Sequence, residues 1–472
     1  MKSSYGLRFG LYEYNENHEL VPTNSKSLKE SLITPTFTVG CMFGSFFAMS
    51  IMDRFGRTKP LIISTFIYAS GALIQTLSNA VFVFCIGRFI SGIACGVSMV
   101  ISPVYIAEIT PKDSRGVMGM LYNLVLQCGI FLASFCDTLS LKFIKGEVQW
   151  RIAVGCQLIP AVLFLILVWF AIETPRYLLM KEKDEEALSV LAKIREKPED
   201  DKEIVSEFSD MTQKLKADLA LGIASWKEIF QNKSIFYRVI IGSILQLLHM
   251  LVGVNAINYY SSQIYSNYLH IDTKKWGAWL VVLSNLIVVI LTVPGIKYVE
   301  KAGRRTLLLW GALALGFCML SIFVLCFILS NYSSSGILGI ICVLFIYAYC
   351  SIYSCTWGSA VFVWQSEVFP LRARSKANAA CVTFQYLGSA LITGTVSIIM
   401  KYLKYYTFLI FLCTCLISYV FTLFCVKETK GLTLEDTNNL YGFDRKYREK
   451  HEKEIMAKKH GNAVQEDNVK EC

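Results

Sequence analysis

Long, uninterrupted runs of apolar residues limit what this sequence can fold into. Eleven such runs of roughly 20 residues or more occur, at residues 33–52, 60–80, 81–107, 116–137, 151–172, 236–265, 276–298, 305–330, 337–365, 376–400 and 406–426. A helix rises 1.5 Å per residue, so about 20 residues cross about 30 Å of hydrocarbon. The runs therefore predict an all-α, polytopic membrane protein with eleven spanning helices.

The composition agrees with this fold class and excludes several others. Of the 472 residues, 54% are hydrophobic and only 17% are charged, whereas about one quarter of the residues of a soluble protein are charged. The net charge of +10 comes from loops and the C-terminal tail, so we expect no nucleic-acid partner. Most of the 16 cysteines lie within apolar runs and are expected to pack as small hydrophobic residues.

No catalytic constellation is recognisable in the sequence. The five histidines are scattered without metal-ligand spacing, and no glycine-rich phosphate loop occurs. We therefore expect no enzyme activity, no metal, no cofactor and no ATP-driven pump.

The positively charged loops predict the orientation in the membrane. Loops 53–59, 111–115, 300–305 and 370–376 are rich in Lys and Arg and fall on one side, together with residues 173–235 and 427–472. The positive-inside rule makes that side cytoplasmic. The predicted organisation is an extracellular segment (1–32), an N-terminal bundle (33–172), a cytoplasmic linker with short amphipathic helices (173–235), a C-terminal bundle (236–426) and a cytoplasmic tail (427–472). The sequon at Asn331 then faces outward and is a glycosylation site, whereas the sequon at Asn232 is not.

The two halves of the chain repeat the same short motifs in the same order. Gly56-Arg57 returns as Gly303-Arg304, 247 residues later. Glu108 and Arg115 return as Glu367 and Arg374, and Glu173-Thr174 returns as Glu428-Thr429. Such ordered echoes predict two related, pseudo-symmetric bundles with a binding site between them near the membrane midplane.

At these motifs the sequence resembles the sugar porter family of the major facilitator superfamily, over residues 36 to 440. The resemblance rests on the stretches at 53–57, 87–88, 173–176, 303–305 and 428–431, and residues 225–230 and 369–372 resemble the fungal hexose-transporter branch. It implies twelve helices in two bundles of six, and the helix without a counterpart here is the first. We expect an additional apolar segment upstream of Met1; the alternative is a protein that lacks this helix.

Charged residues at the cytoplasmic helix ends are predicted to form gating salt bridges. Pairs that bridge the two halves would close a cytoplasmic gate, since partly buried charged hydrogen bonds contribute about 1.5–3 kcal/mol. The candidates are Arg57, Glu108, Arg115, Glu173, Arg176, Glu300, Arg304, Arg305, Glu367 and Arg374. Arg88 is a separate case, because it lies inside an apolar run and needs a partner or a wet cavity.

A sugar site needs side chains that donate and accept hydrogen bonds. The resemblance places such residues at Gln246, His249, Asn255, Tyr259, Asn123 and Gln385, with Phe362 and Tyr386 as aromatic neighbours. Asn255 lies nearly opposite Gln246 on an ideal helix, so both meet one cavity only if the helix unwinds near Gly253. The family's paired glutamines fall on His249 and Met250 here, and the tenth span lacks its two usual prolines.

The resemblance implies a carrier for a hexose or a related monosaccharide or polyol, working by alternating access and facilitative by default. The alternative is a non-transporting sugar sensor or receptor-like relative, which the changed pocket residues suggest. The expected partners are a small sugar and the lipid bilayer, with no obligate protein partner; proton coupling through Arg88 stays open. We expect an integral, multi-pass protein of the plasma membrane with a cytoplasmic C-terminus.

Overall fold

The computed structural model describes residues 4–14, 20–23, 26–111, 115–220, 226–258, 265, 276–332, 336–369 and 371–430. Its elements are α1 (Ser4–Arg8), β1 (Tyr12–Tyr14), β2 (Leu20–Pro22), α2 (Lys26–Phe55), α3 (Thr58–Leu77), α4 (Val81–Ile109), α5 (Arg115–Phe143), α6 (Val148–Gly155), α7 (Leu158–Trp169), α8 (Pro175–Met180), α9 (Asp184–Arg195), α10 (Lys202–Ala220), α11 (Trp226–Gln231), α12 (Lys233–Leu251), α14 (Ala278–Ala302), α15 (Arg304–Asn331), α16 (Gly336–Cys355), α17 (Trp357–Val368), α18 (Leu371–Leu403), the 3₁₀ turn η3 (Lys404–Tyr406) and α19 (Thr407–Cys425).

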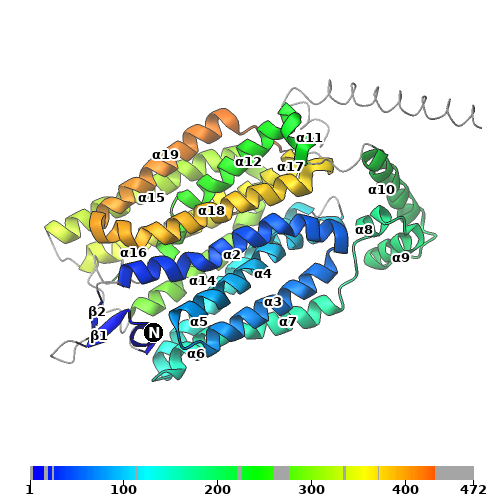
Figure 1. The fold of residues 1–472 in the computed structure, drawn as a ribbon. Coiled ribbons are helices and arrows are strands. Elements are labelled where there is room, and N and C mark those ends of the chain that lie inside the picture. The colour runs from blue at the N-terminus through cyan, green and yellow to red at the C-terminus, as the bar shows by residue number, and fades with distance from the viewer. Residues whose placement is uncertain are drawn as a thin grey trace, which may run out of the picture.

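The predicted spans correspond to long apolar helices that run side by side (Figure 1). Ten helical stretches in the described part of the chain are long and apolar enough to cross a membrane. The last stretch, Ala373–Cys425, contains both α18 and α19, so each of the eleven predicted spans has its helix. The prediction of an all-α, polytopic membrane protein is confirmed. The N-terminal half comprises α2 to α7, and the C-terminal half comprises α12 to α19.

Glycines bring α2 and α4 into backbone contact in the N-terminal half. Gly40 and Gly44 lie one turn apart on α2, and they face Gly92 and Gly96 on α4. A Cβ atom added to Gly44 would lie 2.1 Å from the Ile93 carbonyl oxygen, so no larger residue fits there. Small residues of this kind let membrane helices approach closely enough for their backbones to pack.

The two halves meet along two helix pairs, α2 with α18 and α5 with α14. Figure 1 shows α2 beside α18 along much of their length. Polar side chains contact each other at both seams: the Ser45 and Thr383 hydroxyls lie 3.2 Å apart, and Asn285 Nδ2 donates to Ser134 Oγ at 3.0 Å. The halves are therefore joined by a few hydrogen bonds between otherwise apolar helices.

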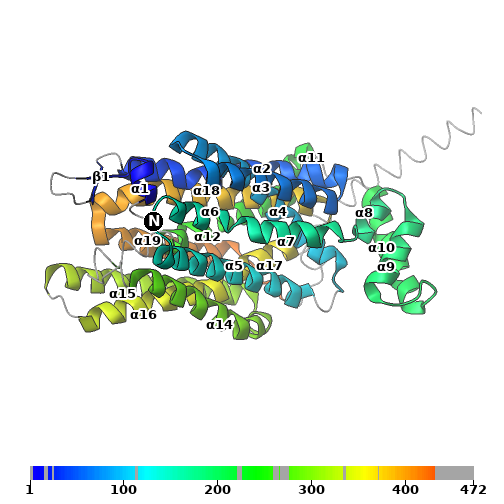
Figure 2. The same cartoon turned by 90° about the horizontal axis from the view of Figure 1, so that it is seen from below.

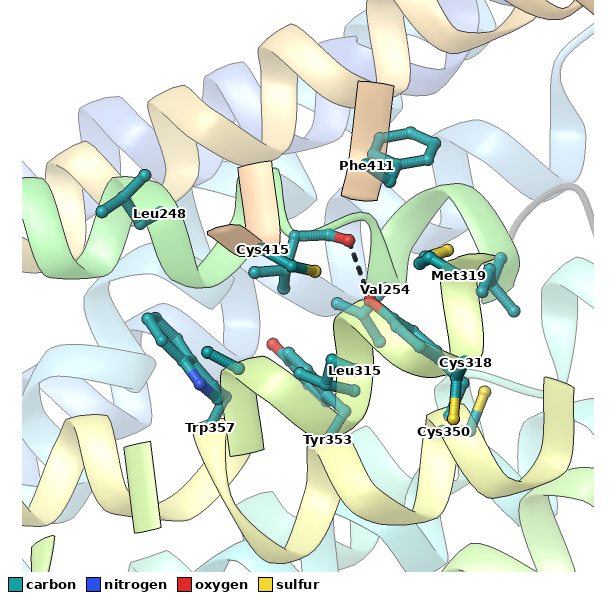
Figure 3. Packing of buried hydrophobic residues seen from close by; sticks show 14 of the residues in the cluster. Leu248, Val254, Leu315, Cys318, Met319, Cys350, Tyr353, Trp357, Phe411 and Cys415 are labelled. Atoms are coloured by element: carbon teal, nitrogen blue, oxygen red, sulfur yellow. Dashed lines mark hydrogen bonds between the residues drawn. The ribbon is translucent and has the colours of Figure 1, made fainter. Parts of the chain in front are cut away.

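The largest buried cluster lies inside the C-terminal half. Side chains of α12, α15, α16, α17 and α19 converge there, among them Leu315, Trp357 and Cys415 (Figure 3). Trp357 Nε1 donates to the Leu308 carbonyl at 3.0 Å, which satisfies the only polar atom of this ring. Among the described spans, the one that contains α12 (Lys233–Asn258) is the most buried: 72% of its most apolar stretch lies inside the protein, against 11% for the span in α5 and 11% for that in α6–α7.

The N-terminal segment is more ordered than its polar composition suggested. It contains α1 and the antiparallel hairpin β1–β2, and α2 begins at Lys26 rather than at residue 33. The reason is a small apolar nucleus, because Phe9 and Leu11 are buried against Trp150 at the end of α6. Burial raises the pKa of the neighbouring Tyr5 phenol to about 12. The segment covers the end of the bundle opposite α8, α9 and α10 (Figures 1 and 2).

Three short helices, α8, α9 and α10, form a cluster beyond the other end of the bundle (Figure 2). The amphipathic spacing that predicted a helix is confirmed, because Ala187 and Leu191 are buried on one face of α9. Arg195 attaches the cluster to the bundle: it pairs with Glu207 of α10 at 2.8 Å and donates to the Ile109 carbonyl at the end of α4 at 2.9 Å. We call this end of the molecule the charged end.

Candidate functional site

A turn between α2 and α3 organises the charged end of the N-terminal half. Gly56 has φ +90°, and an added Cβ would lie 2.4 Å from Glu173 Oε2, so glycine is required there. The turn aims the backbone N–H groups of Arg57 and Thr58 at the Glu173 carboxylate, at 3.1 and 3.2 Å. Negative charge at the start of a helix is stabilised by these free N–H groups.

The side chain of Arg57 extends the same network to α4. Its Nη2 donates to Glu108 Oε1 at 2.8 Å, and Thr174 Oγ1 donates to the other oxygen of Glu108 at 2.7 Å. Both carboxylates therefore hold the ends of three elements together, α3, α4 and the segment before α8.

The C-terminal half contains the same network at equivalent positions. Gly303 has φ +87°, and the Arg304 backbone N–H donates to Glu428 Oε1 at 2.8 Å. Arg304 Nη2 donates to Glu367 Oε1 at 2.8 Å, and Thr429 Oγ1 donates to Glu367 Oε2 at 2.6 Å. The repeated motifs of the sequence thus form two matching structures.

These pairs differ from the expected salt bridges between the two halves. Glu108 pairs with Arg57 and Glu367 with Arg304, so both pairs lie within one half and do not bridge the halves. The cause is the glycine turn. It places Arg57 beside the end of α4, and it places Arg304 beside the end of α17, each within its own bundle. The Arg305 backbone N–H donates to Glu428 Oε2 at 3.0 Å, and its Nη2 donates to the Leu423 carbonyl.

The remaining charged candidates have separate positions. Arg176 lies in α8 without an ion pair to the described residues. Arg374 lies in α18 and donates to the Phe369 carbonyl at 3.3 Å. Arg115 begins α5 and Glu300 lies near the end of α14, and the side chains of both are outside the described part of the structure.

Arg88 lies on α4 among aromatic rings. Its guanidinium carbon is 5.7 Å from the centre of the Phe37 ring and 5.8 Å from that of Phe84. Aromatic faces attract a cation in this way, most strongly where water is excluded. Its Nε is buried and has no hydrogen-bond partner among the described residues.

The predicted interruption of the seventh family helix is confirmed. The helix α12 ends at Leu251, Gly253 has φ +103°, and a short helical turn follows to residue 258. Two hydroxyls replace the helix hydrogen bonds that the break removes. Tyr349 donates to the Val252 carbonyl and Thr414 donates to the Leu251 carbonyl, both at 2.9 Å. The tenth family helix is also interrupted, at Thr356 between α16 and α17, although it lacks prolines.

Two polar residues share one face of α12, and each has a partner on α16 or α17. Gln246 Nε2 donates to Gln365 Oε1. The Tyr353 hydroxyl lies 2.6 Å from His249 Nε2, and the two rings are stacked with their centres 5.2 Å apart. All four side chains are buried.

The other predicted substrate residues have separate positions. Asn255 Nδ2 donates to Ser389 Oγ of α18 at 2.8 Å, and Gln385 is buried on the same helix. Asn123 of α5 has a buried Nδ2 without a partner among the described residues. The ring of Phe362 meets His249 edge-on at 5.6 Å, whereas Tyr386 is buried among α2 and α4 residues. Tyr259 lies outside the described residues.

Sequence reasoning did not select several residues that complete these arrangements. Glu428, Thr174 and Thr429 close the charged networks, and the repeated Glu-Thr motif was the available signal for them. Tyr353 and Gln365 carried no comparable signal, because their partners lie more than 100 residues away in the chain.

Comparison with known proteins agrees with this geometry. The family described as "Sugar (and other) transporter" matches residues 3–441. The Low-affinity glucose transporter HXT4 of Saccharomyces cerevisiae is 32% identical over 443 residues, which cover 92% of this chain and 75% of that protein. The High-affinity hexose transporter HXT6 of the same yeast is 31% identical over 451 residues, covering 92% and 76%.

The fold is likewise similar to solved structures. The proton:xylose symporter XylE bound to 6-bromo-6-deoxy-D-glucose has a TM-score of 0.73 and 24% identity, with 87% of this chain and 89% of that chain covered. A partially occluded inward open XylE from E. coli has a TM-score of 0.72. By its sequence and its paired bundles, the chain belongs to the sugar porter family of the major facilitator superfamily.

Proposed function

We propose that this protein carries a hexose, or a related monosaccharide or polyol, across a membrane by alternating access of a central site. The yeast relatives at 31–32% identity are named as glucose and hexose transporters, and they match over 92% of this chain. The family assignment and this degree of coverage support sugar as the substrate class.

The single observation that carries the proposal is the chemistry of the interrupted helix α12. Gln246 and His249 lie on α12 and Asn255 lies in the helical turn that follows it; all three are buried or half-buried, and each contacts another polar side chain. A buried set of uncharged groups that donate and accept hydrogen bonds suits a neutral ligand with several hydroxyls. A charged substrate would be left without a counter-charge in such a site.

The arrangement of the two halves supports movement between two states. Each half has its own charged network, so its helix ends are held together independently of the other half. The seams between the halves contain few hydrogen bonds, such as the contact between Ser45 and Thr383. Rocking of one bundle against the other is the expected way to expose a midplane site to each side in turn.

We further propose that transport is facilitative. Among the described residues no carboxylate pairs with Arg88, whose guanidinium contacts aromatic rings instead. A proton-coupled carrier needs a group that gains and loses a proton during the cycle. The structural neighbour XylE is named as a proton:xylose symporter, so coupling is the alternative that the experiment must separate.

We also propose that the protein resides in the plasma membrane, with the charged end and the C-terminus in the cytoplasm. Loop lysines and arginines concentrate at that end, as the positive-inside rule expects.

The test is uptake of radiolabelled sugars by purified protein in liposomes. Saturable, stereoselective uptake that is unchanged by an imposed pH gradient supports a facilitative carrier, and acceleration by an inward proton gradient indicates a symporter. Uptake equal to that of empty liposomes over a panel of hexoses, pentoses and polyols contradicts the proposal. Sugar binding without uptake would instead identify the sensor-like alternative.

A further inference from the structure

Gln365 and Tyr353 were not among the predicted substrate residues, but they contact Gln246 and His249. These contacts decide which atoms of the site donate and which accept hydrogen bonds. We propose that Gln365 orients Gln246 so that its Oε1 can accept from a ligand, and that Tyr353 orients His249 so that its Nδ1 can donate to a ligand. The site then selects an uncharged ligand with two hydroxyls near each other, one of which donates while the other accepts. This inference rests on the proposed carrier function and names the substrate features that its central site reads.

The amide chain has only one consistent direction. Gln365 Nε2 donates to the Asn378 backbone carbonyl at 3.4 Å and to its side-chain oxygen at 3.2 Å. A backbone carbonyl only accepts, so the Gln365 nitrogen must face α18 and its oxygen must face α12. Gln246 meets that oxygen with its own Nε2. The oxygen of Gln246 is therefore left as an acceptor.

The imidazole of His249 is fixed in a similar way. The Tyr353 hydroxyl is 2.6 Å from His249 Nε2 and 3.4 Å from the His249 carbonyl, and our proposal assigns its proton to the shorter contact. A buried imidazole without a counter-charge is neutral, and a neutral ring that accepts at Nε2 carries its proton at Nδ1. His249 Nδ1 is therefore a donor.

Both of these atoms are buried and unused. Gln246 is 0% exposed and His249 is 2% exposed. Neither Gln246 Oε1 nor His249 Nδ1 has a hydrogen-bond partner among the described residues. Leaving buried polar atoms unpaired is unfavourable, and our proposal is that a polar ligand completes these two, which belong to residues on one face of α12.

The positions of the two residues on α12 limit the ligand. Gln246 and His249 are three residues apart in α12 and share one face, about 5–6 Å apart at their Cβ atoms. A hydroxyl group can either donate or accept, so one ligand hydroxyl donates to Gln246 and a nearby one accepts from His249. An ammonium group only donates and a carboxylate only accepts, so either satisfies only one of the two atoms.

The experiment measures KM for D-glucose and for its monodeoxy analogues in liposomes. Three variants keep the side-chain size and remove one polar function: Gln365→Met, Tyr353→Phe and the control Tyr347→Phe. Tyr347 lies on the same helix as Tyr353, and its hydroxyl donates to the Leu280 carbonyl, away from α12. For the parent, loss of either recognised hydroxyl should raise KM about 2- to 10-fold, as one hydrogen bond contributes about 0.5–1.5 kcal/mol.

We expect Gln365→Met to abolish discrimination at one hydroxyl and Tyr353→Phe to abolish it at another, while Tyr347→Phe keeps both. The double variant Gln246→Met, Gln365→Met should match Gln246→Met alone, because Gln365 acts through Gln246. Unchanged discrimination in both single variants, or an equal rise in KM for every analogue, overturns the inference while transport by the parent still supports the carrier function. A parent without uptake defeats both.

A second measurement does not depend on whether Gln365→Met or Tyr353→Phe folds. Nitrogen chemical shifts of histidine in the ¹⁵N-labelled parent, with the His249 signal assigned by its loss in His249→Gln, report which ring nitrogen carries the proton. We expect protonation at Nδ1. Protonation at Nε2 would make His249 an acceptor and overturn the assignment.

Discussion

The Arg57 guanidinium lies 2.8 Å from the Glu108 carboxylate, and its counterpart Arg304 lies at the same distance from Glu367. In both halves a glycine with positive φ precedes the arginine, and a Glu-Thr pair after the last helix of that half closes the network. The two halves thus repeat the same side-chain contacts as well as the same order of helices. The two networks differ in burial, which has a measurable consequence.

Removing Arg57 should destabilise the protein more than removing Arg304. The Arg57 and Glu108 side chains are 3% and 8% exposed, against 13% and 31% for Arg304 and Glu367. Loss of one partner from a buried pair costs about 3–5 kcal/mol, whereas a charged hydrogen bond with more solvent contributes about 1.5–3 kcal/mol. Thermal melting of Arg57→Ala and Arg304→Ala in detergent measures the difference, with Arg176→Ala as a control. Equal melting temperatures would refute this ranking.

The contact between α2 and α4 should not tolerate even one methyl group. A Cβ at Gly44 would lie 2.1 Å from a backbone oxygen, whereas nothing lies within 4 Å of a Cβ at Gly129 of α5. We therefore expect Gly44→Ala to lower the melting temperature and the yield. Gly129→Ala should be neutral or stabilising by up to about 1 kcal/mol, since alanine favours helix. If both substitutions behave alike, the close packing described here is wrong.

Glycosylation tests the orientation. Asn331 is exposed at the end of α15, far from Gly303 at the other end of that helix, and its sequon is expected outside the cell. Asn232 is buried and caps α12 by accepting from the Ser234 and Ile235 N–H groups. Treatment with an endoglycosidase should therefore shift the parent on a gel but not Asn331→Gln. A shift that persists in Asn331→Gln and vanishes in Asn232→Gln would reverse the assigned orientation.

A contact between Trp226 and Phe46 links α2 of the N-terminal half to α11, which packs on the C-terminal half, at the charged end. The rings are stacked with centres 6.4 Å apart, and Trp226 lies in α11 next to residues that pack on α18. An aromatic pair contributes about 0.5–1.5 kcal/mol beyond its area. Trp226→Ala should therefore shift the balance between conformations about 2- to 10-fold away from the present one. Distances between spin labels on the two halves report this shift.

Phe230→Ala is the matched control, because Phe230 lies on the same helix but contacts Phe236 within its own half. Identical distance distributions for Trp226→Ala and the parent would show that the stack does not couple the halves.

The helices were predictable because apolar runs of this length have one stable form in a bilayer. The interruption at Gly253 was also predictable, since Gln246 and Asn255 could not otherwise face one site. The break at Thr356 was not expected without prolines; directly after it, Trp357 is buried and donates to the Leu308 carbonyl. The order of the N-terminal segment depends on the contact of Phe9 with the distant Trp150, which no local pattern reveals.

The candidate site was predictable only in part. Repeated motifs identified the glutamates and arginines of the charged networks, but they did not indicate that Glu108 pairs with Arg57. Short sequence separation is a poor guide here, because both pairs join residues that are more than 50 positions apart in the chain. The partners of Gln246 and His249 come from α17 and α16, and only the packing of those helices brings them together.

Counterflow in liposomes tests the central claim most directly. Liposomes that contain the protein and a high concentration of unlabelled hexose are diluted into a trace of labelled hexose, and the internal label is followed over time. A site that opens to one side at a time predicts a transient accumulation of label above its external concentration, which then decays. A monotonic approach to equilibrium, or a time course equal to that of empty liposomes, would contradict alternating access of a sugar site.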